Sequence, residues 1–142
     1  MPLTDDEQNQ RRAALRDIFP TTPFIASLGL VIERYEPDVA AVRLPFRADL
    51  TNDGSVYHGG VIASVMDTTG ALAAWSNHDF DRGSRASTVS MTINYIGAAK
   101  QSDLLAHARA RKRGRELIFT DIEALDADGN LVADAIQVYR IV

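Results

Sequence analysis

The residues best suited to chemistry lie in segment 58–75, which opens with a histidine and two glycines and carries one acid, Asp67, among small and apolar side chains. Burying an ionised carboxylate is costly unless it is paired or hydrogen-bonded, so such an acid either faces water or is kept for chemistry. Amides at a helix start have no partner within the helix and lie at the positive end of its dipole. Gly59 and Gly60 therefore suit an oxyanion or a polarised carbonyl, and one helix can supply both halves of a hydrolytic site.

Each of these residues also has a purely structural explanation. Asp67 taken alone fits a solvated acid on the outer face of the helix. His58 fits a helix cap, and the two glycines fit close packing of the helix start against a strand. Asn52 fits the turn that the Asn-Asp-Gly sequence at 52–54 predicts. The catalytic interpretation depends on these residues occurring together.

The composition narrows the class of protein. A length of 142 residues fits one domain, and a hydrophobic share of 46% is enough to fill a core. The chain shows no apolar run long enough to span a membrane, and its N-terminal segment is acidic and polar, so we expect a cytoplasmic protein without a signal peptide. The absence of cysteine excludes disulfides and thiolate chemistry. A net charge of −4 gives no general attraction to nucleic acid, so an anionic ligand requires a local basic patch.

The hydrophobic pattern predicts an α+β architecture of one long helix, a short leading helix and five or six mostly antiparallel strands. Thr4 and Glu7 have the spacing of a capping box, which predicts a polar first helix ending near residue 18. We expect the long helix at about 58–76 and strands at 31–35, 39–46, 88–95, 104–111, 117–125 and 131–141. Strand 88–95 alternates strictly, which places Val89 and Met91 on one face and Thr88 on the other.

Five features follow one another along the chain: Asn52, the His-Gly-Gly run at 58–60, Asp67, the Thr-Ile-Asn-Tyr run at 92–95 and the Arg-Gly-Arg turn at 113–115. Together they resemble the hotdog-fold acyl-CoA thioesterases of the PaaI branch, which includes thioesterase superfamily member 2, within the 4-hydroxybenzoyl-CoA thioesterase superfamily. The most specific part is the spacing of six and nine positions from Asn52 to His58 and from His58 to Asp67. The resemblance implies a single hotdog domain over 1–142, with a helical extension at 1–19 and a core at 24–141.

The resemblance also implies a role for each residue of the candidate site. Asp67 matches the catalytic carboxylate of the family, and the backbone N–H of Gly59 matches its oxyanion donor. Asn52 and His58 match loop residues that orient the substrate or the attacking water. Thr88 matches a hydroxyl that assists the acid, where some members have serine. Members of the wider fold differ in whether the acid attacks directly, so Asp67 is expected to act as a general base or as a nucleophile.

A basic cluster stands out in the otherwise acidic chain and comprises Arg109, Arg111, Lys112, Arg113 and Arg115. A run of charge is usually a solvated hairpin, but the phosphates of coenzyme A can pair with arginine. The resemblance places this turn and the segment around residue 100 near the nucleotide. The residues expected to bind the substrate or its CoA moiety are Gly60, Lys100, Arg113, Gly114 and Arg115.

The expected function is hydrolysis of an aryl- or medium-chain acyl-CoA to the free acid and CoA, with no metal and no organic cofactor. Coenzyme A thiolate leaves readily, so one carboxylate and one N–H donor suffice. The resemblance implies a homodimer with its active sites at the interface as the minimal unit, and a homotetramer as a dimer of dimers. We expect neither a nucleic acid nor a membrane partner. Two alternatives stay open: a non-catalytic acyl-CoA-binding protein, and an acyl-thioester hydratase or dehydratase, although the acid-and-histidine motif usual for the latter is absent.

Overall fold

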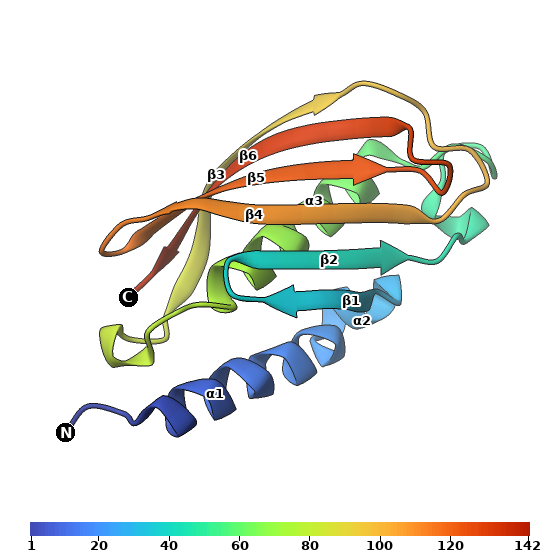
Figure 1. Cartoon of the computed structure of the whole chain (residues 1–142). Coiled ribbons are helices and arrows are strands. Elements are labelled where there is room, and N and C mark those ends of the chain that lie inside the picture. The colour runs from blue at the N-terminus through green and yellow to red at the C-terminus, as the bar shows by residue number, and fades with distance from the viewer.

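The computed structural model describes residues 1–142 as a six-stranded antiparallel sheet packed against one long helix (Figure 1). The strands are β1 (Val31–Glu36), β2 (Val39–Leu44), β3 (Ala86–Tyr95), β4 (Leu104–Arg113), β5 (Leu117–Leu125) and β6 (Leu131–Ile141). The helices are α1 (Asp5–Ile18), α2 (Pro23–Leu28) and α3 (Gly59–Trp75), with short 3-10 turns η1 (Phe19–Thr21), η2 (Ala48–Leu50) and η3 (Phe80–Arg82). The strand order is β1-β2-β4-β5-β6-β3. The α+β architecture predicted from the sequence is confirmed.

Helix α3 lies against one face of the sheet because its side chains are apolar on almost every side. Met66 and Leu72 are completely or almost completely buried and belong to a core cluster of 20 buried residues. Strand β4 turns Ala106 and Ala108 toward this core, and both are buried. Small side chains on the facing strand let the helix approach the sheet closely. The helix that carries Asp67 is therefore held rigidly.

The N-terminal segment forms the polar first helix that the capping box predicted. The Thr4 side chain accepts a hydrogen bond from the Glu7 N–H, and the Glu7 carboxylate accepts one from the Thr4 N–H at 2.8 Å. Helix α1 runs along the β1 edge of the sheet (Figure 1), where the Tyr35 hydroxyl donates to the Arg12 carbonyl at 3.1 Å. Segment 23–28 adds a short helix that starts with proline in its first turn, where the missing N–H costs nothing. No helix of the chain has the length and hydrophobicity needed to cross a membrane.

Strand β3 is an edge strand, and its pairing with β6 contains a β-bulge. The pairing of Thr88 with Tyr139 is followed directly by that of Ser90 with Val138, so Val89 is the extra residue. An extra residue exchanges the two faces of a strand, because side chains alternate with a period of two. The strict alternation predicted for this strand is therefore wrong at its start. Thr88 points toward α3, while Val89 is 56% exposed.

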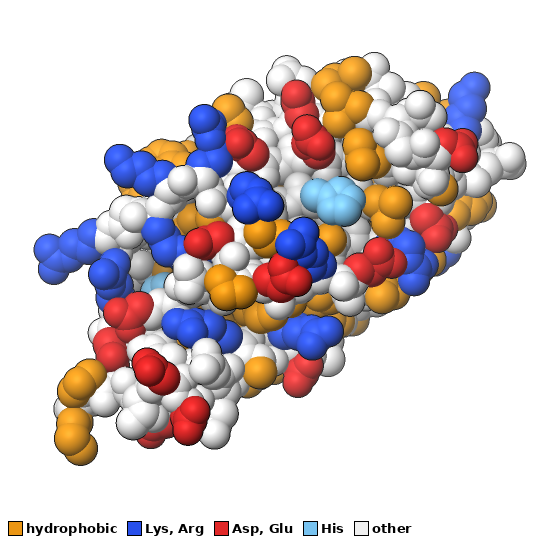
Figure 2. Space-filling view, viewed as in Figure 1, with side chains coloured by type: hydrophobic (Ala, Val, Ile, Leu, Met, Phe, Trp, Pro, Cys, Tyr) orange, Lys and Arg blue, Asp and Glu red, His pale blue; other side chains and the backbone are white.

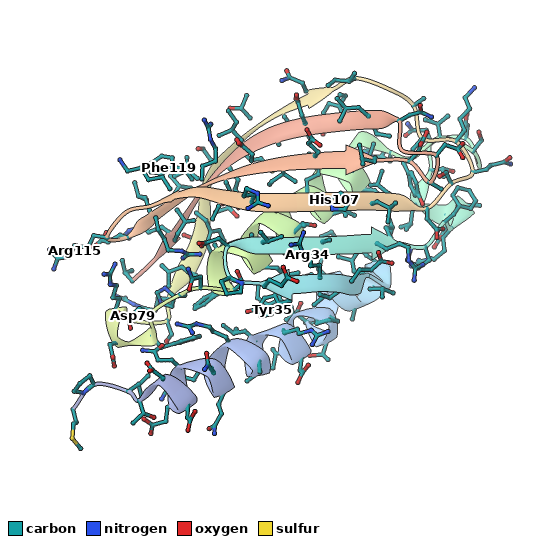
Figure 3. The ribbon with its side chains drawn as sticks, viewed as in Figure 1. Arg34, Tyr35, Asp79, His107, Arg115 and Phe119 are labelled. Carbon is teal, nitrogen blue, oxygen red and sulfur yellow. The ribbon has the colours of Figure 1, made fainter.

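The outer face of the sheet is charged, with both signs interspersed (Figure 2). Arg109 of β4 lies opposite Asp121 of β5, so these cross-strand neighbours have complementary charge, and His107 lies opposite Glu123. Figure 3 shows His107 on this face, directed away from α3. The two faces of the sheet thus differ sharply, and the polar residues that reach α3 on the inner face are exceptions that require an explanation.

Candidate active site

Asp67 lies in the middle of α3 and is partly buried. Its Oδ1 atom accepts two hydrogen bonds, from the Thr88 hydroxyl at 2.7 Å and from Nε2 of Gln137 at 2.7 Å. Neither donor carries a charge, and no group of the chain donates to Oδ2. The structure therefore brings Asp67 and Thr88 together, and it adds Gln137, which the sequence analysis did not identify. A carboxylate held in this way is not a freely solvated acid.

The start of α3 is arranged so that one backbone amide stays unused. His58 is the N-cap residue, and its Nδ1 atom accepts a hydrogen bond from the Gly60 N–H at 2.8 Å. An accepting Nδ1 means that the imidazole is neutral, with its proton on Nε2. A Cβ on Gly60 would lie 3.0 Å from this Nδ1 atom, so glycine makes room for the cap. The Gly59 N–H has no acceptor in the chain, so it is the donor left for an oxyanion.

Tyr95, at the end of β3, fixes the position of Gly59. Its hydroxyl donates to the Gly59 carbonyl at 3.1 Å, and its ring would lie 3.4 Å from a Cβ at Gly59. An open, apolar hollow of about 370 Å³ adjoins these two residues, and the side chains of Ile62 and Ile96 line it. Burial raises the pKa of Tyr57, which also lines the hollow, to about 12, so its hydroxyl stays protonated at neutral pH. The free amide thus borders a surface suited to an apolar group.

The loop before α3 holds Asn52 with its side chain free. The turn is built instead by Asp53, whose Oδ1 atom accepts hydrogen bonds from the N–H groups of Ser55 at 2.9 Å and Val56 at 2.8 Å. These two bonds lower the pKa of the Asp53 carboxyl. Lys100 forms a β-bridge with Val56, which places it against the same loop. The side-chain amide of Asn52 makes no hydrogen bond within the chain and is exposed, whereas its backbone N–H donates to the Val56 carbonyl at 2.9 Å.

The two central groups of the candidate site lie too far apart to act together within one chain. Gly59 and Asp67 are separated by eight residues of a regular helix, which corresponds to about 12 Å along its axis. An oxyanion donor and a base must both lie within hydrogen-bond reach of one reacting group. Within one chain, the Gly59 N–H and the Asp67 carboxylate are therefore not placed to act on the same reacting group.

Arg113 lies at the opposite end of α3 and is engaged in the fold. Its Nε atom donates to Oδ1 of Asp38 at 2.8 Å, and its Nη2 atom donates to the Ala73 carbonyl at 3.2 Å. Ala73 follows Gly59 by 14 residues, or about 21 Å of helix. The expected binding residues are therefore divided within one chain. Gly60 and Lys100 lie at the start of α3, and the Arg-Gly-Arg turn lies at its end.

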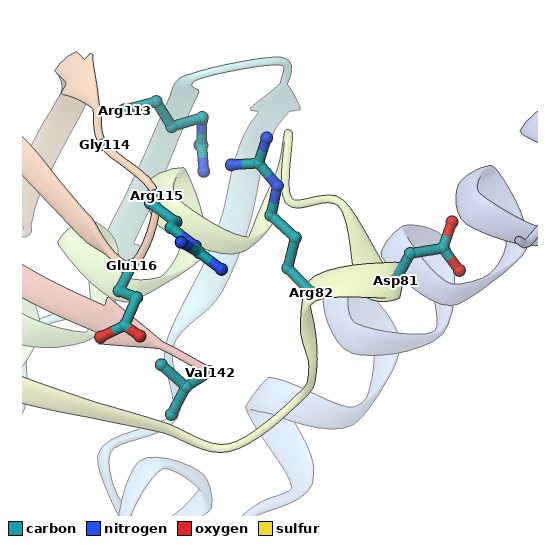
Figure 4. A pocket seen from close by; sticks show the side chains of 7 residues that line it. All are labelled: Asp81, Arg82, Arg113, Gly114, Arg115, Glu116 and Val142. Carbon is teal, nitrogen blue, oxygen red and sulfur yellow. The ribbon is translucent and has the colours of Figure 1, made fainter.

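That turn borders the largest cavity, an open hollow of about 760 Å³ (Figure 4) lined by Asp81, Arg82, Arg113, Gly114, Arg115, Glu116 and Val142. Arg82 forms an ion pair with Asp79, with 3.5 Å between Nε and Oδ2, and Glu116 forms one with Arg140, with 3.0 Å between Oε2 and Nη2. Arg115 makes no ion pair within the chain, and it projects from the tip of the β4–β5 hairpin (Figure 3). Of the three arginines around this cavity, Arg115 alone has an uncommitted guanidinium group.

Comparison with known proteins identifies the family. Residues 54–133, more than half of the chain, match the family described as the thioesterase superfamily. The chain belongs to this superfamily. The medium/long-chain acyl-CoA thioesterase YigI of Salmonella typhimurium is 25% identical over 132 residues, which cover 84% of this chain and 85% of the relative.

Two solved structures show the same fold. The conserved protein PA5202 from Pseudomonas aeruginosa has 34% identity and a TM-score of 0.78, over 85% of this chain and 94% of that chain. The E. coli PaaI protein from the phenylacetic acid degradation operon has 23% identity and a TM-score of 0.81, over 95% of this chain and 94% of that chain. The predicted hotdog fold and the prediction of a thioester hydrolase are confirmed.

Gln137 is the residue of this region that the sequence analysis missed. Its signal was present in β6, where the inward-facing residues are Ala135, Gln137, Tyr139 and Ile141, so one amide interrupts an apolar row. All four are buried. The chain gathers no group of three or more histidine, cysteine, aspartate or glutamate side chains with the arrangement of a metal site. The polar groups found around Asp67 and at the start of α3 are a carboxylate, neutral hydrogen-bond donors and one free backbone amide.

Proposed function

We propose that this thioester hydrolase acts on aryl- or medium-chain acyl-CoA, with Asp67 as the catalytic carboxylate and the Gly59 N–H as the oxyanion donor. The observation that carries the proposal is the hydrogen bonding of the Asp67 carboxylate. Its Oδ1 atom accepts from two neutral donors, and its Oδ2 atom has no donor within the chain. The acyl-CoA substrates named for the relative YigI support the substrate class.

In the general-base form of the mechanism, Oδ2 of Asp67 removes a proton from water as the water oxygen attacks the thioester carbon. The Gly59 N–H stabilises the negative charge that forms on the carbonyl oxygen, and such a donor is worth about 10² to 10³ in rate. The C–S bond then breaks, and the proton held by Asp67 goes to the CoA thiolate. In the nucleophilic form, Asp67 attacks the thioester carbon, and the C–S bond breaks as CoA leaves as the thiolate. Water then hydrolyses the mixed anhydride to the free acid and the Asp67 carboxylate, and the proton released goes to the CoA thiolate.

The other residues of the site support these two groups. The His58 side chain accepts a hydrogen bond from the Gly60 N–H, so the Gly59 N–H is the unpaired donor at the start of α3. Asn52, with its free amide, orients the substrate or the water, and Thr88 orients Asp67. Because the thiolate leaves readily, the reaction proceeds without a metal or an organic cofactor.

The proposed catalytic unit is a homodimer in which Asp67 of one copy faces Gly59 of the other. The separation of about 12 Å within one helix supports this arrangement. Strand β3 supports it too, because one edge of this ten-residue strand is unpaired, and Val89 and Tyr95 are 56% and 53% exposed. A long edge with exposed apolar side chains is a template for pairing with another strand. Two such dimers are proposed to form a tetramer.

The proposal is tested by release of free thiol from benzoyl-, phenylacetyl- and hexanoyl-CoA. Asp67→Asn is expected to lower kcat by at least about 10²-fold with the fold intact, because the variant has neither a base nor a nucleophile. Asp134→Asn is the matched control, since that acid bonds only to Asn94 on the neighbouring strand. Dialysis against a chelator is expected to leave the rate unchanged. An Asp67→Asn variant with wild-type turnover contradicts the assignment.

The shared active site is tested with two inactive variants, Asp67→Asn and Gly59→Pro. When the two are unfolded and refolded together, mixed dimers contain one site with both an intact Gly59 and an intact Asp67. We expect the mixture to regain activity that neither variant shows alone. If activity does not return although mixed dimers form, each site is built from a single chain.

A further inference from the structure

Gln137 is a completely buried polar side chain on the inner face of the sheet. Removing a primary amide from water is unfavourable unless its groups find partners. The Oε1 atom of Gln137 is buried and has no hydrogen-bond partner, so the site of this residue is not optimised for stability. The reason for an amide at this position therefore has to lie in the hydrogen bonds that Nε2 makes.

Both hydrogen bonds of Nε2 go to the same residue. The atom donates to Oδ1 of Asp67 at 2.7 Å and to the backbone carbonyl of Asp67 at 3.0 Å. The first bond restrains the Asp67 carboxylate, and the second holds the Gln137 amide against the backbone of α3. The hydroxyl of Thr88, from β3, donates to the same Oδ1 atom at 2.7 Å. Donors from two strands, β3 and β6, thus bond to Oδ1 of Asp67, and Oδ2 has no donor within the chain.

Helix α3 is adapted to admit this amide. Gly70 lies one turn after Asp67, and a Cβ built there would approach Oε1 of Gln137 to 2.3 Å and Cδ1 of Ile122 to 2.8 Å. Any larger residue at this position would collide with the amide. Glycine inside a helix is unfavourable relative to alanine, so the space at Gly70 is kept against the preference of the helix.

We infer that Gln137 is the positioning residue of the catalytic acid: it fixes the rotation of the Asp67 carboxylate so that Oδ2 alone faces the thioester. The inference rests on the proposed role of Asp67. The torsion that turns a carboxylate is soft, and without Gln137 the Thr88 hydroxyl is the one donor left on Oδ1, so the two oxygens sample a wider range of orientations. Misplacement of a catalytic group by about 1 Å can cost about 10²-fold in rate.

The test compares Gln137→Met, which keeps the length of the side chain and removes its donors, with Thr120→Val. Thr120 lies opposite Gln137 on β5, is equally buried, has an unpaired hydroxyl and makes no bond to Asp67. We expect Gln137→Met to lower kcat about 10- to 10²-fold with little change in KM. Thr120→Val is expected to leave both constants unchanged. Wild-type kcat in Gln137→Met overturns the inference.

A double-mutant cycle separates positioning from a general structural effect. If Gln137 acts only through Asp67, adding Gln137→Met to Asp67→Asn lowers kcat no further. A loss of the same factor in both backgrounds assigns Gln137 a structural role and overturns the inference. Wild-type kcat in Asp67→Asn itself contradicts the proposed function instead. Should Gln137→Met fail to fold, Gly70→Ala takes its place, because the added Cβ displaces the amide of Gln137 from the other side, and wild-type kcat in that variant overturns the inference as well.

Discussion

The two ends of α3 use their polar groups in opposite ways. At the C-terminal end, the Ser76 hydroxyl donates to the Ala73 carbonyl at 2.7 Å and accepts from the Asp38 N–H at 2.9 Å, and Asp38 also binds Asn77 and Arg113. At the N-terminal end, only the Gly60 amide is capped, and the Gly59 N–H has no partner. The C-terminal end is closed by hydrogen bonds within the chain, whereas the N-terminal end leaves one donor unpaired.

This difference shows that charge density in a sequence does not reveal which polar groups the fold leaves unpaired. The basic cluster contains the densest positive charge of the chain, but Arg113 pairs with Asp38 and Arg111 pairs with Asp121 at 3.1 Å. The Gly59 N–H carries no formal charge, but nothing within the chain competes for it. The groups that the fold leaves unpaired are therefore the first candidates for binding a ligand.

The largest effect is expected from closing the open end of α3. Gly59→Pro removes the free N–H but keeps the helix, because proline is favoured in the first turn and the extended backbone of His58 is compatible with a following proline. We expect kcat to fall about 10²- to 10³-fold, the usual value of one oxyanion donor. Gly59→Ala is the control, since it keeps the N–H and brings its Cβ no closer than 3.4 Å to Tyr95. Equal loss in both variants would point to crowding rather than to the amide.

The closed end is expected to affect stability and not turnover. Arg113→Gln removes the ion pair with Asp38 and the bond to the Ala73 carbonyl. We expect the free energy of unfolding, measured by urea denaturation, to fall by about 1 kcal/mol, because both groups are partly exposed. The value of kcat should stay at the wild-type level. A large rise of KM without loss of stability would instead make Arg113 a substrate ligand.

A smaller effect is expected at Arg115, the uncommitted arginine of the cavity in Figure 4. If it contacts the CoA phosphates, Arg115→Gln raises KM for an acyl-CoA about threefold, as loss of one exposed ion pair implies. The KM for the corresponding pantetheine thioester, which lacks the nucleotide, should not change. Lys112→Gln, a neighbouring exposed charge, is the control. Equal changes for both substrates exclude phosphate binding by Arg115.

The smallest effect concerns the acid stability of the closed end, where His78 packs against Trp75 and Phe80. Burial lowers the pKa of His78, so the folded protein keeps it neutral while the unfolded chain takes up a proton below about pH 6.5. The contribution of His78 to the free energy of unfolding is therefore fully present above this pH and decreases as the pH falls toward 5. We expect the urea midpoint to fall less between pH 7 and pH 5 in His78→Gln than in the wild type. Parallel pH profiles would exclude His78 as the source.

Much of the fold follows from local pattern. The Thr4 and Glu7 spacing predicted the first helix, and the hydrophobic pattern at 117–125 and 131–141 predicted β5 and β6 with the bounds that the structure has. Glycines before an apolar run predicted the start of α3. These features depend on interactions within a few residues or on a simple periodicity, so the sequence alone contains them.

The sequence by itself thus determined the first helix, the long helix, the six strands and the family motifs that single out Asn52, Gly59 and Asp67. Only the tertiary structure decided which groups meet. A single bulge at Val89 turned Thr88 toward Asp67, and Gln137 reached the same carboxylate from 70 residues away. Strand register and competition for hydrogen-bond donors are properties of the packed chain, so no local pattern encodes them.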